Sequence, residues 1–309
     1  MNKHIKIGTR GSKLALWQAY LIESLLQAGG FTTELDIIET KGDKILDVSL
    51  SKIGSKGLFT EELEDKLRSG EIDIAVHSAK DVQSQLDEDL ELIAFTDREI
   101  VNDVLVGNDK SFTLASGKPL VVGTSSVRRR AMLQYYYPHI KMVDMRGNLQ
   151  TRLKKLEDGH CDVLLLAFAG VHRMEYDDRI IEMLDLKEFT PAVGQGSVAV
   201  ESAVALDAEK KEAIRKLVNH EPTSVCLLAE RALLKKLQGG CSIPVFGLSY
   251  LKEGNQYLDC GVAGLDGQTM LRHEAIRLAG ETAEEFGEKA ALKLIEMGAL
   301  EVLSALRKK

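Results

Sequence analysis

Short apolar runs alternate with amphipathic stretches along most of this chain, and this alternation limits the possible folds more than any other feature. The expected strands are residues 4–8, 34–39, 72–76, 104–106, 121–123, 141–143 and 163–167. The helices expected between them are residues 13–27, 60–69, 127–136 and 148–157. Strands that alternate with helices indicate βαβ units and a largely parallel sheet. We therefore expect an α/β protein with two lobes.

The pattern changes after about residue 220, where consecutive strands are flanked by helices. Helices are expected at residues 223–237 and 282–297, and strands at residues 244–251, 256–262 and 269–278. This order is typical of a small α+β domain. A chain of 309 residues with 44% hydrophobic content is also long enough for two or three cores.

Two segments interrupt the alternation and are expected to cross between the lobes. They are residues 98–103 and residues 189–196, and in the second Pro191 and two glycines break regular structure. Two crossings would let the lobes open and close on a ligand. The predicted domains are a first α/β domain of residues 1–97 and 191–217, a second of residues 98–190, and a C-terminal α+β domain of residues 218–309.

Composition excludes several classes of protein. The longest apolar run, residues 163–171, is too short to span a bilayer, and the N-terminal residues do not resemble a signal peptide. The four cysteines have no CxxC spacing, which indicates neither a disulfide framework nor a zinc site, and the scattered histidines favour no other metal. Only 5% of the residues are aromatic and the net charge is −7, which argues against nucleic-acid binding. A cytoplasmic enzyme or binding protein without nucleic-acid, membrane or metal partner is expected.

Positive charge is concentrated in one part of this acidic chain. Residues 121–155 carry eight basic side chains and one acid, a local charge of +7. The small residues 123–126 expose backbone N–H groups where a strand gives way to a helix, and Ser126 can cap that helix, so the pattern indicates a carboxylate or phosphate site. The alternative is a solvated helix face. Because successive helical residues point about 100° apart, at most two of Arg128, Arg129 and Arg130 can share a cleft.

Two more strand-to-helix junctions repeat this pattern. Arg10 follows the first strand, with Ser12 placed to cap the next helix, and Arg146 precedes a helix that carries Arg152 in its first turns. If the junctions converge, the ligand is a polyanion with several separated charges.

A carboxylate and a thiol are candidates for chemistry. Asp81, beside Lys80, follows the strand at residues 72–76 at its carboxyl end, where open α/β sheets bind ligands. It can transfer protons or supply a counter-charge, although Asp also serves often as a cap or turn residue. Cys241 lies in a Gly-Gly-Cys loop that leaves its thiol accessible; the alternative is an ordinary half-buried cysteine. A cysteine hydrolase would need a histidine beside this thiol, and the sequence indicates none.

Seven segments together resemble the porphobilinogen deaminase family, also called the hydroxymethylbilane synthases. They are GTRGSKLALWQA (8–19), GLFTEELE (57–64), AVHSAKD (75–81), GTSSVRRR (123–130), RGN (146–148), PAVGQG (191–196) and GGC (239–241). So many linked motifs in order are highly specific, whereas the C-terminal strands and last helix resemble the family in pattern only.

The resemblance implies a transferase that condenses four porphobilinogen molecules head to tail, with loss of ammonia, and releases a linear hydroxymethylbilane. It implies that Cys241 carries a dipyrromethane cofactor as a thioether, on which the product grows. The implied fold has two domains like those of type II periplasmic binding proteins and a third domain that bears the cysteine, and a monomer is expected.

The resemblance also implies roles for single residues. Asp81 would hydrogen-bond pyrrole N–H groups and stabilise the positive centre left when ammonia departs. The residues implied to hold the cofactor are Lys80, Ser126, Arg128, Arg129, Arg146 and Arg152. Those implied to hold substrate are Arg10, Ser12, Phe59 and Arg173, while Lys52 and Lys56 belong to a lid region.

The chain departs from the family pattern at two places. Gln83 stands where the family usually has proline, and Ile-Val-Asn-Asp at residues 100–103 replaces the usual Asp-Pro-Arg-Asp. The absence of an arginine at Asn102 removes one possible carboxylate contact. A two-lobed module that binds an organic anion without chemistry remains the alternative, because folds do not determine function.

Overall fold

The computed structural model describes residues 3–41, 60–238 and 243–307. The chain forms two compact units: residues 1–99 with 196–225, and residues 100–195 with 226–309.

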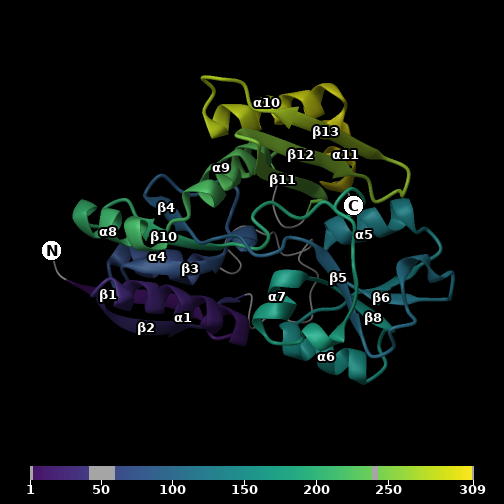
Figure 1. Cartoon of the computed structure of the whole chain (residues 1–309), viewed down its shortest axis with the longest axis horizontal. Coiled ribbons are helices and arrows are strands. Elements are labelled where there is room, and N and C mark those ends of the chain that lie inside the picture. Colours follow the sequence, from purple (N-terminus) through teal and green to yellow (C-terminus); the bar gives the residue numbers. More distant parts are fainter. Residues whose placement is uncertain (1–2, 42–59, 239–242, 308–309) are drawn as a thin grey trace. The chain divides into compact units, whose positions relative to one another are not determined.

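The first unit is built on a five-stranded sheet of order β2-β1-β3-β10-β4 (Figure 1). Its strands are β1 (His4–Arg10), β2 (Thr32–Ile38), β3 (Ile74–Ser78), β4 (Leu90–Phe95) and β10 (Val198–Ala203). β1 runs parallel to β2 and β3, whereas β10 runs antiparallel to both β3 and β4. Helices cover both faces of this sheet. α1 (Lys13–Ala28) and α8 (Ala208–Val218) pack on one face through residues that include Ile22 and Ile214, and α4 (Glu61–Ser69) packs on the other through Leu63.

The second unit contains a sheet of the same design, with order β7-β6-β8-β5-β9. Its strands are β5 (Asp103–Gly107), β6 (Val121–Gly123), β7 (Lys141–Val143), β8 (Val163–Ala167) and β9 (Ile180–Met183). β6 is parallel to β7 and β8, and β5 is antiparallel to β8 and β9. Both sheets therefore have one inverted strand at the same position, and in both it is the first strand after the chain enters the unit at residue 100 or 196.

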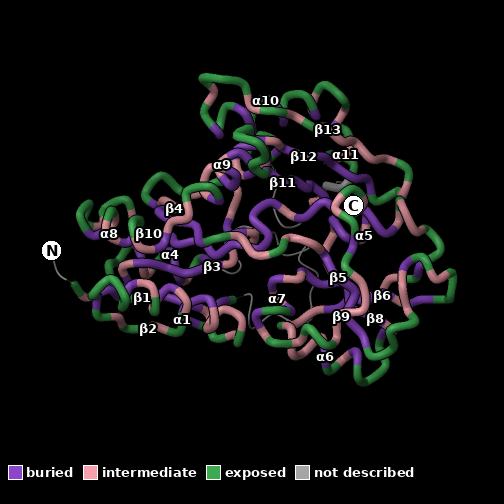
Figure 2. Tube along the Cα trace, viewed as in Figure 1, coloured by how far each residue is buried: buried purple, intermediate pink, exposed green. Residues whose placement is uncertain are grey.

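The helices of this second sheet also lie on both faces. α5 (Val127–Tyr136) packs on one face through Ala131 and Met132, whereas α6 (Leu149–Glu157) and α7 (Phe168–Arg173) pack on the other. The inner strands β3 and β10 of one sheet and β5 and β8 of the other are buried almost throughout, as Figure 2 shows. The 3-10 turns of the two units are η1 (Ala79–Asp81), η2 (Leu114–Ser116) and η3 (Asp177–Arg179).

A third, antiparallel sheet of order β11-β12-β13 follows α9 (Glu221–Lys236). Its strands are β11 (Val245–Lys252), β12 (Asn255–Ala263) and β13 (Met270–Ile276), followed by α10 (Ala283–Glu296) and α11 (Ala299–Arg307). Phe246 and Ala263 from this sheet belong to the same apolar core as Met132 and Phe189, so within the second unit the C-terminal sheet and the α5 face share a core.

The structure confirms the α/β class and the separate C-terminal sheet, and it corrects two expectations. The main sheets are mixed, because β10 and β5 enter antiparallel. Three strands, β4, β9 and β10, and three helices, α7, α8 and α11, were not anticipated. In β10 the charged Glu201 interrupts the apolar pattern although it is fully buried, which conceals the strand in the sequence.

Candidate anion-binding and active site

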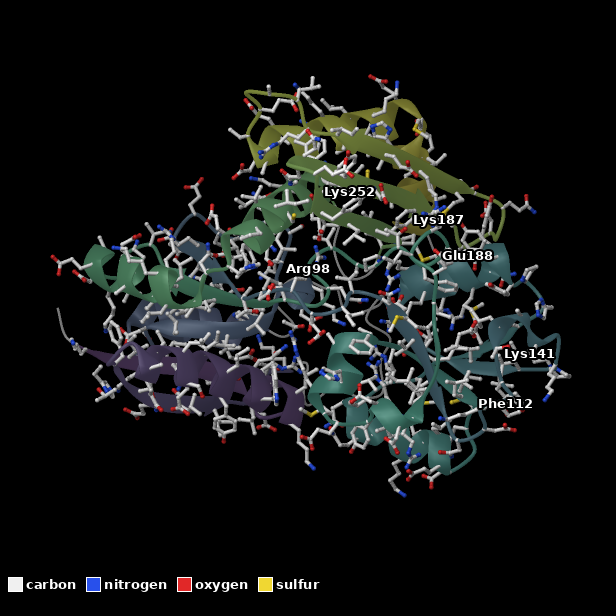
Figure 3. All side chains as sticks on the ribbon, viewed as in Figure 1. Arg98, Phe112, Lys141, Lys187, Glu188 and Lys252 are labelled. Atoms are coloured by element: carbon white, nitrogen blue, oxygen red, sulfur yellow. The ribbon has the colours of Figure 1, made fainter. Side chains whose placement is uncertain are left out.

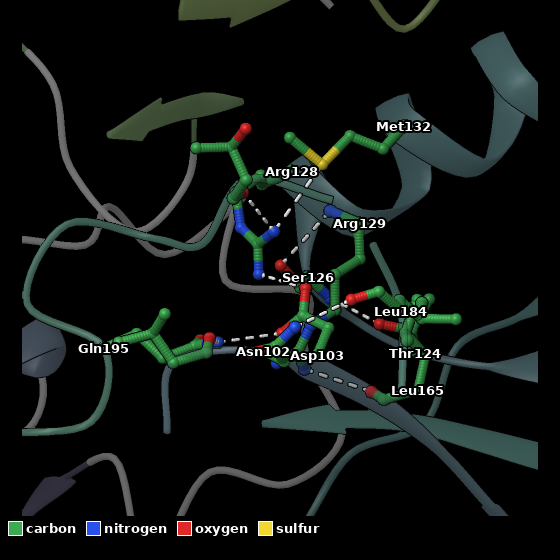
Figure 4. A network of polar contacts seen from close by, with 12 residues as sticks. Asn102, Asp103, Thr124, Ser126, Arg128, Arg129, Met132, Leu165, Leu184 and Gln195 are labelled. Atoms are coloured by element: carbon green, nitrogen blue, oxygen red, sulfur yellow. Dashed lines mark hydrogen bonds and ion pairs between the residues drawn. The ribbon is translucent and has the colours of Figure 1, made fainter. Parts of the chain in front are cut away.

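Two of the three consecutive arginines are buried around one carboxylate, as the helical spacing indicated. Arg128 Nη2 lies 2.7 Å from Asp103 Oδ2, and Arg129 Nη2 lies 2.7 Å from Asp103 Oδ1 (Figure 4). Arg128 is 4% exposed, Arg129 6% and Asp103 0%, while Arg130 is only half-buried. The remaining Nη1 groups donate to backbone carbonyls, Arg128 to Thr190 at 2.8 Å and Arg129 to Leu165 at 3.0 Å.

The charges of this cluster do not cancel. Burial by itself would raise the pKa of Asp103, but Arg128 and Arg129 lower the pKa of this carboxyl well below its usual range. Burial lowers the pKa of Arg128, and the neighbouring Arg129 adds to this, because one carboxylate has to balance two guanidinium groups. The cluster of Arg128, Arg129 and Asp103 therefore holds one positive charge in excess, which is costly to bury unless an anion binds there.

The same two guanidinium groups also carry buried Nε–H donors for which no described residue supplies an acceptor. The Nε atoms of Arg128 and Arg129 are buried, and neither has a hydrogen-bond partner among the residues that the structure describes. A buried donor without an acceptor costs about 1–3 kcal/mol. Excess charge and unused donors both indicate a missing anionic acceptor.

The loops after β6 and β7 bring two predicted junctions together. Ser126 caps α5 by accepting from the Arg129 N–H at 3.5 Å, and its neighbour Ser125 accepts from the Met145 N–H at 2.9 Å. Asn148 caps α6 with a bond of 2.9 Å from the Thr151 N–H. Because β6, β7 and β8 are parallel neighbours, the residues that follow them lie at one edge of the sheet.

Three further predicted residues follow this edge. Arg146 comes after β7, and Arg152 in α6 donates from Nε to the Gly147 carbonyl at 2.8 Å. Gly147 has φ 109°, and a Cβ there would meet Thr151 at 2.6–2.7 Å, so this tight turn requires glycine. Arg173 ends α7, the helix after β8, and is 9% exposed. The second unit thus gathers guanidinium groups at the carboxyl ends of three strands.

The first unit has the corresponding arrangement with a carboxylate. β1 leads to Arg10 and Ser12, and Ser12 caps α1 by accepting from the Ala15 N–H at 3.3 Å. β3, the parallel neighbour of β1, leads to Lys80 and Asp81 in η1. Asp81 is exposed, and its carboxylate has no hydrogen bond or ion pair with any residue in the described part of the chain. It does not serve as a helix cap, which leaves it available to a ligand.

Buried polar side chains lie beside the turn that carries Asp81. His77 Nε2 in β3 lies 2.9 Å from Glu201 Oε2 in β10, and both side chains are buried. Gln83 donates from Nε2 to Glu64 Oε1 at 2.9 Å and to Thr60 Oγ1 at 3.2 Å, which ties the chain after Asp81 to α4. Burial raises the pKa of Glu64, and the nearby Glu201 adds to this. Gln83, a departure from the family pattern, thus has a structural role here.

Asn102, the second departure, also has a defined contact. Its Nδ2 donates to the Leu184 carbonyl at 2.9 Å, beside the Asp103 cluster (Figure 4). The predicted residues Cys241, Lys52, Lys56 and Phe59 lie outside the described residues.

Sequence reasoning missed Asp103, Thr190 and Gln195. Gln195 donates from Nε2 to Asp103 Oδ1 at 2.9 Å and to the Val101 carbonyl at 2.7 Å. Asp103 is the first residue of an apolar run, a position where an acid ordinarily indicates a turn. The one available signal was the run of three arginines itself, since buried guanidinium groups require a carboxylate partner.

Comparison with known proteins identifies the family of this chain. Residues 5–212 match the family described as "Porphobilinogen deaminase, dipyromethane cofactor binding domain", and residues 224–296 match "Porphobilinogen deaminase, C-terminal domain". The chain belongs to the porphobilinogen deaminase family. The resemblance seen in the seven sequence motifs is therefore confirmed.

Relatives within the porphobilinogen deaminase family match the whole chain. A porphobilinogen deaminase of Cytophaga hutchinsonii is 54% identical over 308 residues, which cover 100% of this chain and 98% of the relative. Another from Desulfosudis oleivorans is 49% identical over 305 residues, 98% of each chain. The similarity therefore extends through the C-terminal domain, where the motifs alone had not reached.

Solved structures of periplasmic binding domains show a weaker likeness. The methionine-binding protein MetQ has a TM-score of 0.44 and 13% identity, covering 70% of this chain and 90% of that chain. The periplasmic VFT2 domain of Bordetella pertussis BvgS has a TM-score of 0.43 and 20% identity, covering 70% and 87%. The likeness between the two units of this chain is shown by the strand order that their main sheets share.

Two further findings concern the described residues only. No helix among them is long and apolar enough to cross a membrane. No group of three or more His, Cys, Asp or Glu side chains within the described ranges is placed to hold a metal ion.

Proposed function

We propose that this member of the porphobilinogen deaminase family condenses four porphobilinogen molecules head to tail into the linear tetrapyrrole hydroxymethylbilane. In each step a carbon–carbon bond forms between the free pyrrole carbon of the growing chain and the methylene carbon of the incoming unit, ammonia leaves that aminomethyl group, and the free pyrrole carbon loses its proton. After four additions, water cleaves the bond between product and primer, which supplies the hydroxyl of the hydroxymethyl group and returns a proton to the primer ring. The observation that carries the proposal is the buried cluster of Arg128, Arg129 and Asp103, with one unbalanced positive charge and two unused Nε donors.

The cluster suits the chemistry of the proposed substrate. Each pyrrole unit carries an acetate and a propionate, so a chain of up to six rings presents about a dozen carboxylates, and guanidinium groups bind carboxylates with paired hydrogen bonds. One carboxylate at the cluster would neutralise the excess charge and accept from the free Nε–H groups. Arg10, Ser12, Arg146, Arg152 and Arg173 would hold other carboxylates as rings are added.

The residues fit a dipyrromethane cofactor on the same grounds. When bound to Cys241 as a thioether, this group supplies the free pyrrole position to which the first substrate is joined. Ser126, Arg128 and Arg129 would hold its acidic side chains, with Lys80, Arg146 and Arg152 as further partners. These residues would neutralise the carboxylates of the cofactor and keep the reacting end of the pyrrole chain in one orientation.

Asp81 is the proposed catalytic residue. Its exposed carboxylate has no partner within the described ranges, so it can accept hydrogen bonds from pyrrole N–H groups. There it would stabilise the positive charge that develops on the substrate carbon when ammonia leaves, and take up or return a proton nearby. Gln83, through its hydrogen bonds to Glu64 and Thr60, would hold the turn that presents it.

The finer organisation follows from the same proposal. We assign residues 1–97 and 191–217 to one α/β domain, residues 98–190 to the second, and residues 218–309 to a C-terminal domain that carries Cys241. Phe59 would contact substrate, and Lys52 and Lys56 would belong to a lid. The enzyme would act in the cytoplasm as a monomer, without a nucleic-acid partner.

The test is the mass of the purified protein. Protein produced with ample porphobilinogen should exceed the sequence mass by two pyrrole units and should react with Ehrlich's reagent, and Cys241→Ser should lose both the added mass and turnover. An unmodified Cys241 under these conditions contradicts the proposal. Retention of full ligand affinity in Cys241→Ser, with no turnover in the parent protein, would favour the alternative of a simple anion-binding module.

A further inference from the structure

The guanidinium group of Arg272, in the C-terminal sheet, reaches residues 188–190, the segment whose Thr190 carbonyl accepts a hydrogen bond from Arg128. Arg272 in β13 donates from Nη1 to Thr190 Oγ1 at 2.9 Å and from Nη2 to the Glu188 carbonyl at 3.0 Å. Glu188, the first residue of this segment, is labelled in Figure 3. All of these residues lie in the second compact unit, so their arrangement is internal to one body.

Thr190 connects Arg272 to the anion-binding cluster. Its carbonyl accepts from Arg128 Nη1 at 2.8 Å, and its hydroxyl donates to the Leu186 carbonyl at 2.8 Å while it accepts from Arg272. Both polar groups of this buried residue are therefore engaged, which leaves its backbone little freedom. Since Arg128 has only Asp103 and the Thr190 carbonyl as oxygen acceptors among the described residues, a shift of Thr190 would turn its guanidinium group.

Arg272 is itself held firmly. Its guanidinium carbon lies 4.8 Å from the centre of the fully buried Phe246 ring, a cation–π contact. Arg272 is not needed merely to attach this segment to the C-terminal sheet. Phe189 is already packed in the shared core, and the Gly247 N–H donates to the Pro191 carbonyl at 3.1 Å. These contacts keep the segment attached to β11 without Arg272. What Arg272 adds is orientation: it fixes the hydroxyl of Thr190 and the carbonyl of Glu188 two residues earlier, and so restricts the backbone whose Thr190 carbonyl accepts from Arg128.

We propose that Arg272 is a positioning residue that acts through Thr190 to set the guanidinium group of Arg128 for an incoming carboxylate. This inference rests on the proposed function, in which that carboxylate belongs to the bound primer. Because the primer is held covalently, faulty orientation should lower kcat and leave KM for free porphobilinogen nearly unchanged.

The test compares variants as loaded holoenzyme, with kcat expressed per molecule that carries the primer by mass. Arg272→Met keeps most of the side chain's apolar bulk and loses both hydrogen bonds, and should lower kcat about tenfold, the equivalent of one charge-assisted bond. Thr190→Val should do the same, and the double variant should be no worse than either single one, since both break the same connection. Arg272→Lys keeps the charge but has a single donor nitrogen in place of the guanidinium fork, and its kcat should lie between those of Arg272→Met and the parent protein. The matched control is Arg277→Met, which removes the same charge just after β13 and should retain full kcat.

A second measurement does not depend on activity. In isotope-labelled protein, the NMR signal of the Arg128 Nε–H should move in Arg272→Met and in Thr190→Val, but not in Arg277→Met. An unmoved signal, or an unchanged kcat per loaded molecule in Arg272→Met, overturns the inference. If the parent protein carries no primer, the proposed function fails instead, and the NMR comparison still decides whether Arg272 orients Arg128.

Discussion

Asp103→Asn tests the charge balance of the arginine cluster. The substitution keeps the shape of the side chain but raises the buried charge from one excess positive to two, and it weakens two contacts of 2.7 Å. Breaking a buried ion pair by removing one partner costs about 3–5 kcal/mol, because the remaining charge stays desolvated. We expect a loss of that size in the free energy of unfolding of the second unit, measured by urea denaturation at pH 7.

The pH dependence of the unfolding free energy provides a second test of the same prediction. The folded pKa of Asp103 lies below its unfolded value near 4, so its contribution to stability is complete above about pH 5 and is lost as the pH falls below 4. Asp103→Asn should therefore flatten the acid limb of the stability profile and change it little between pH 6 and 8. Asp158→Asn, which alters an exposed pair with Lys154 at 3.4 Å, is the matched control and should cost less than about 1 kcal/mol.

The proposal for the anion site adds one further expectation. Carboxylates bound at the cluster would supply negative charge that Asp103→Asn lacks, so the variant should lose less stability with its primer than in the Cys241→Ser background. A loss below about 1 kcal/mol in primer-free Asp103→Asn would refute the reasoning, since it would mean that the two guanidinium groups are not confined with a single counter-ion.

Three other predictions follow from the described contacts. Asp81→Ala should keep the melting temperature within a few degrees and remove most turnover, because the exposed carboxylate has no partner within the described ranges; turnover equal to the parent's excludes Asp81 from catalysis. Gln83→Ala should lower the unfolding free energy by about 1–2 kcal/mol in urea titrations, because two hydrogen bonds to α4 are lost, and exposed Gln85→Ala is the control. Burial raises the pKa of Cys161 to about 11 and of Cys260 to about 12, so neither should react with iodoacetamide at pH 8 in the folded protein; rapid labelling seen by mass spectrometry would contradict their burial.

The parts of the fold that were predictable are those in which one local pattern decides the structure. β7, β8 and α5 occupy the expected residues because an apolar run or a capped amphipathic stretch is sufficient to specify each. β10 was not predictable in this way. Its buried Glu201 lies 2.9 Å from His77 Nε2, more than a hundred residues earlier in the chain, and no local pattern reveals such a neighbour.

The same distinction holds at the site. Helical spacing predicted that at most two of the three arginines could share a cleft, and strand-end positions predicted Asp81 and Arg146. Asp103, Thr190 and Arg272 could not be found, because each contacts Arg128, or a residue that holds it, only after the second unit has folded.

The composition of the arginine cluster lowers the stability of the fold. Burying two guanidinium groups with one carboxylate opposes stability, and a sequence selected for stability alone would replace one arginine by an apolar residue. Conflicts of this kind are expected where a protein must bind something, because the ligand supplies what the fold lacks. The missing element here is an acceptor with negative charge. That requirement follows from Arg128, Arg129 and Asp103 alone, and the carboxylates of a pyrrole chain meet it.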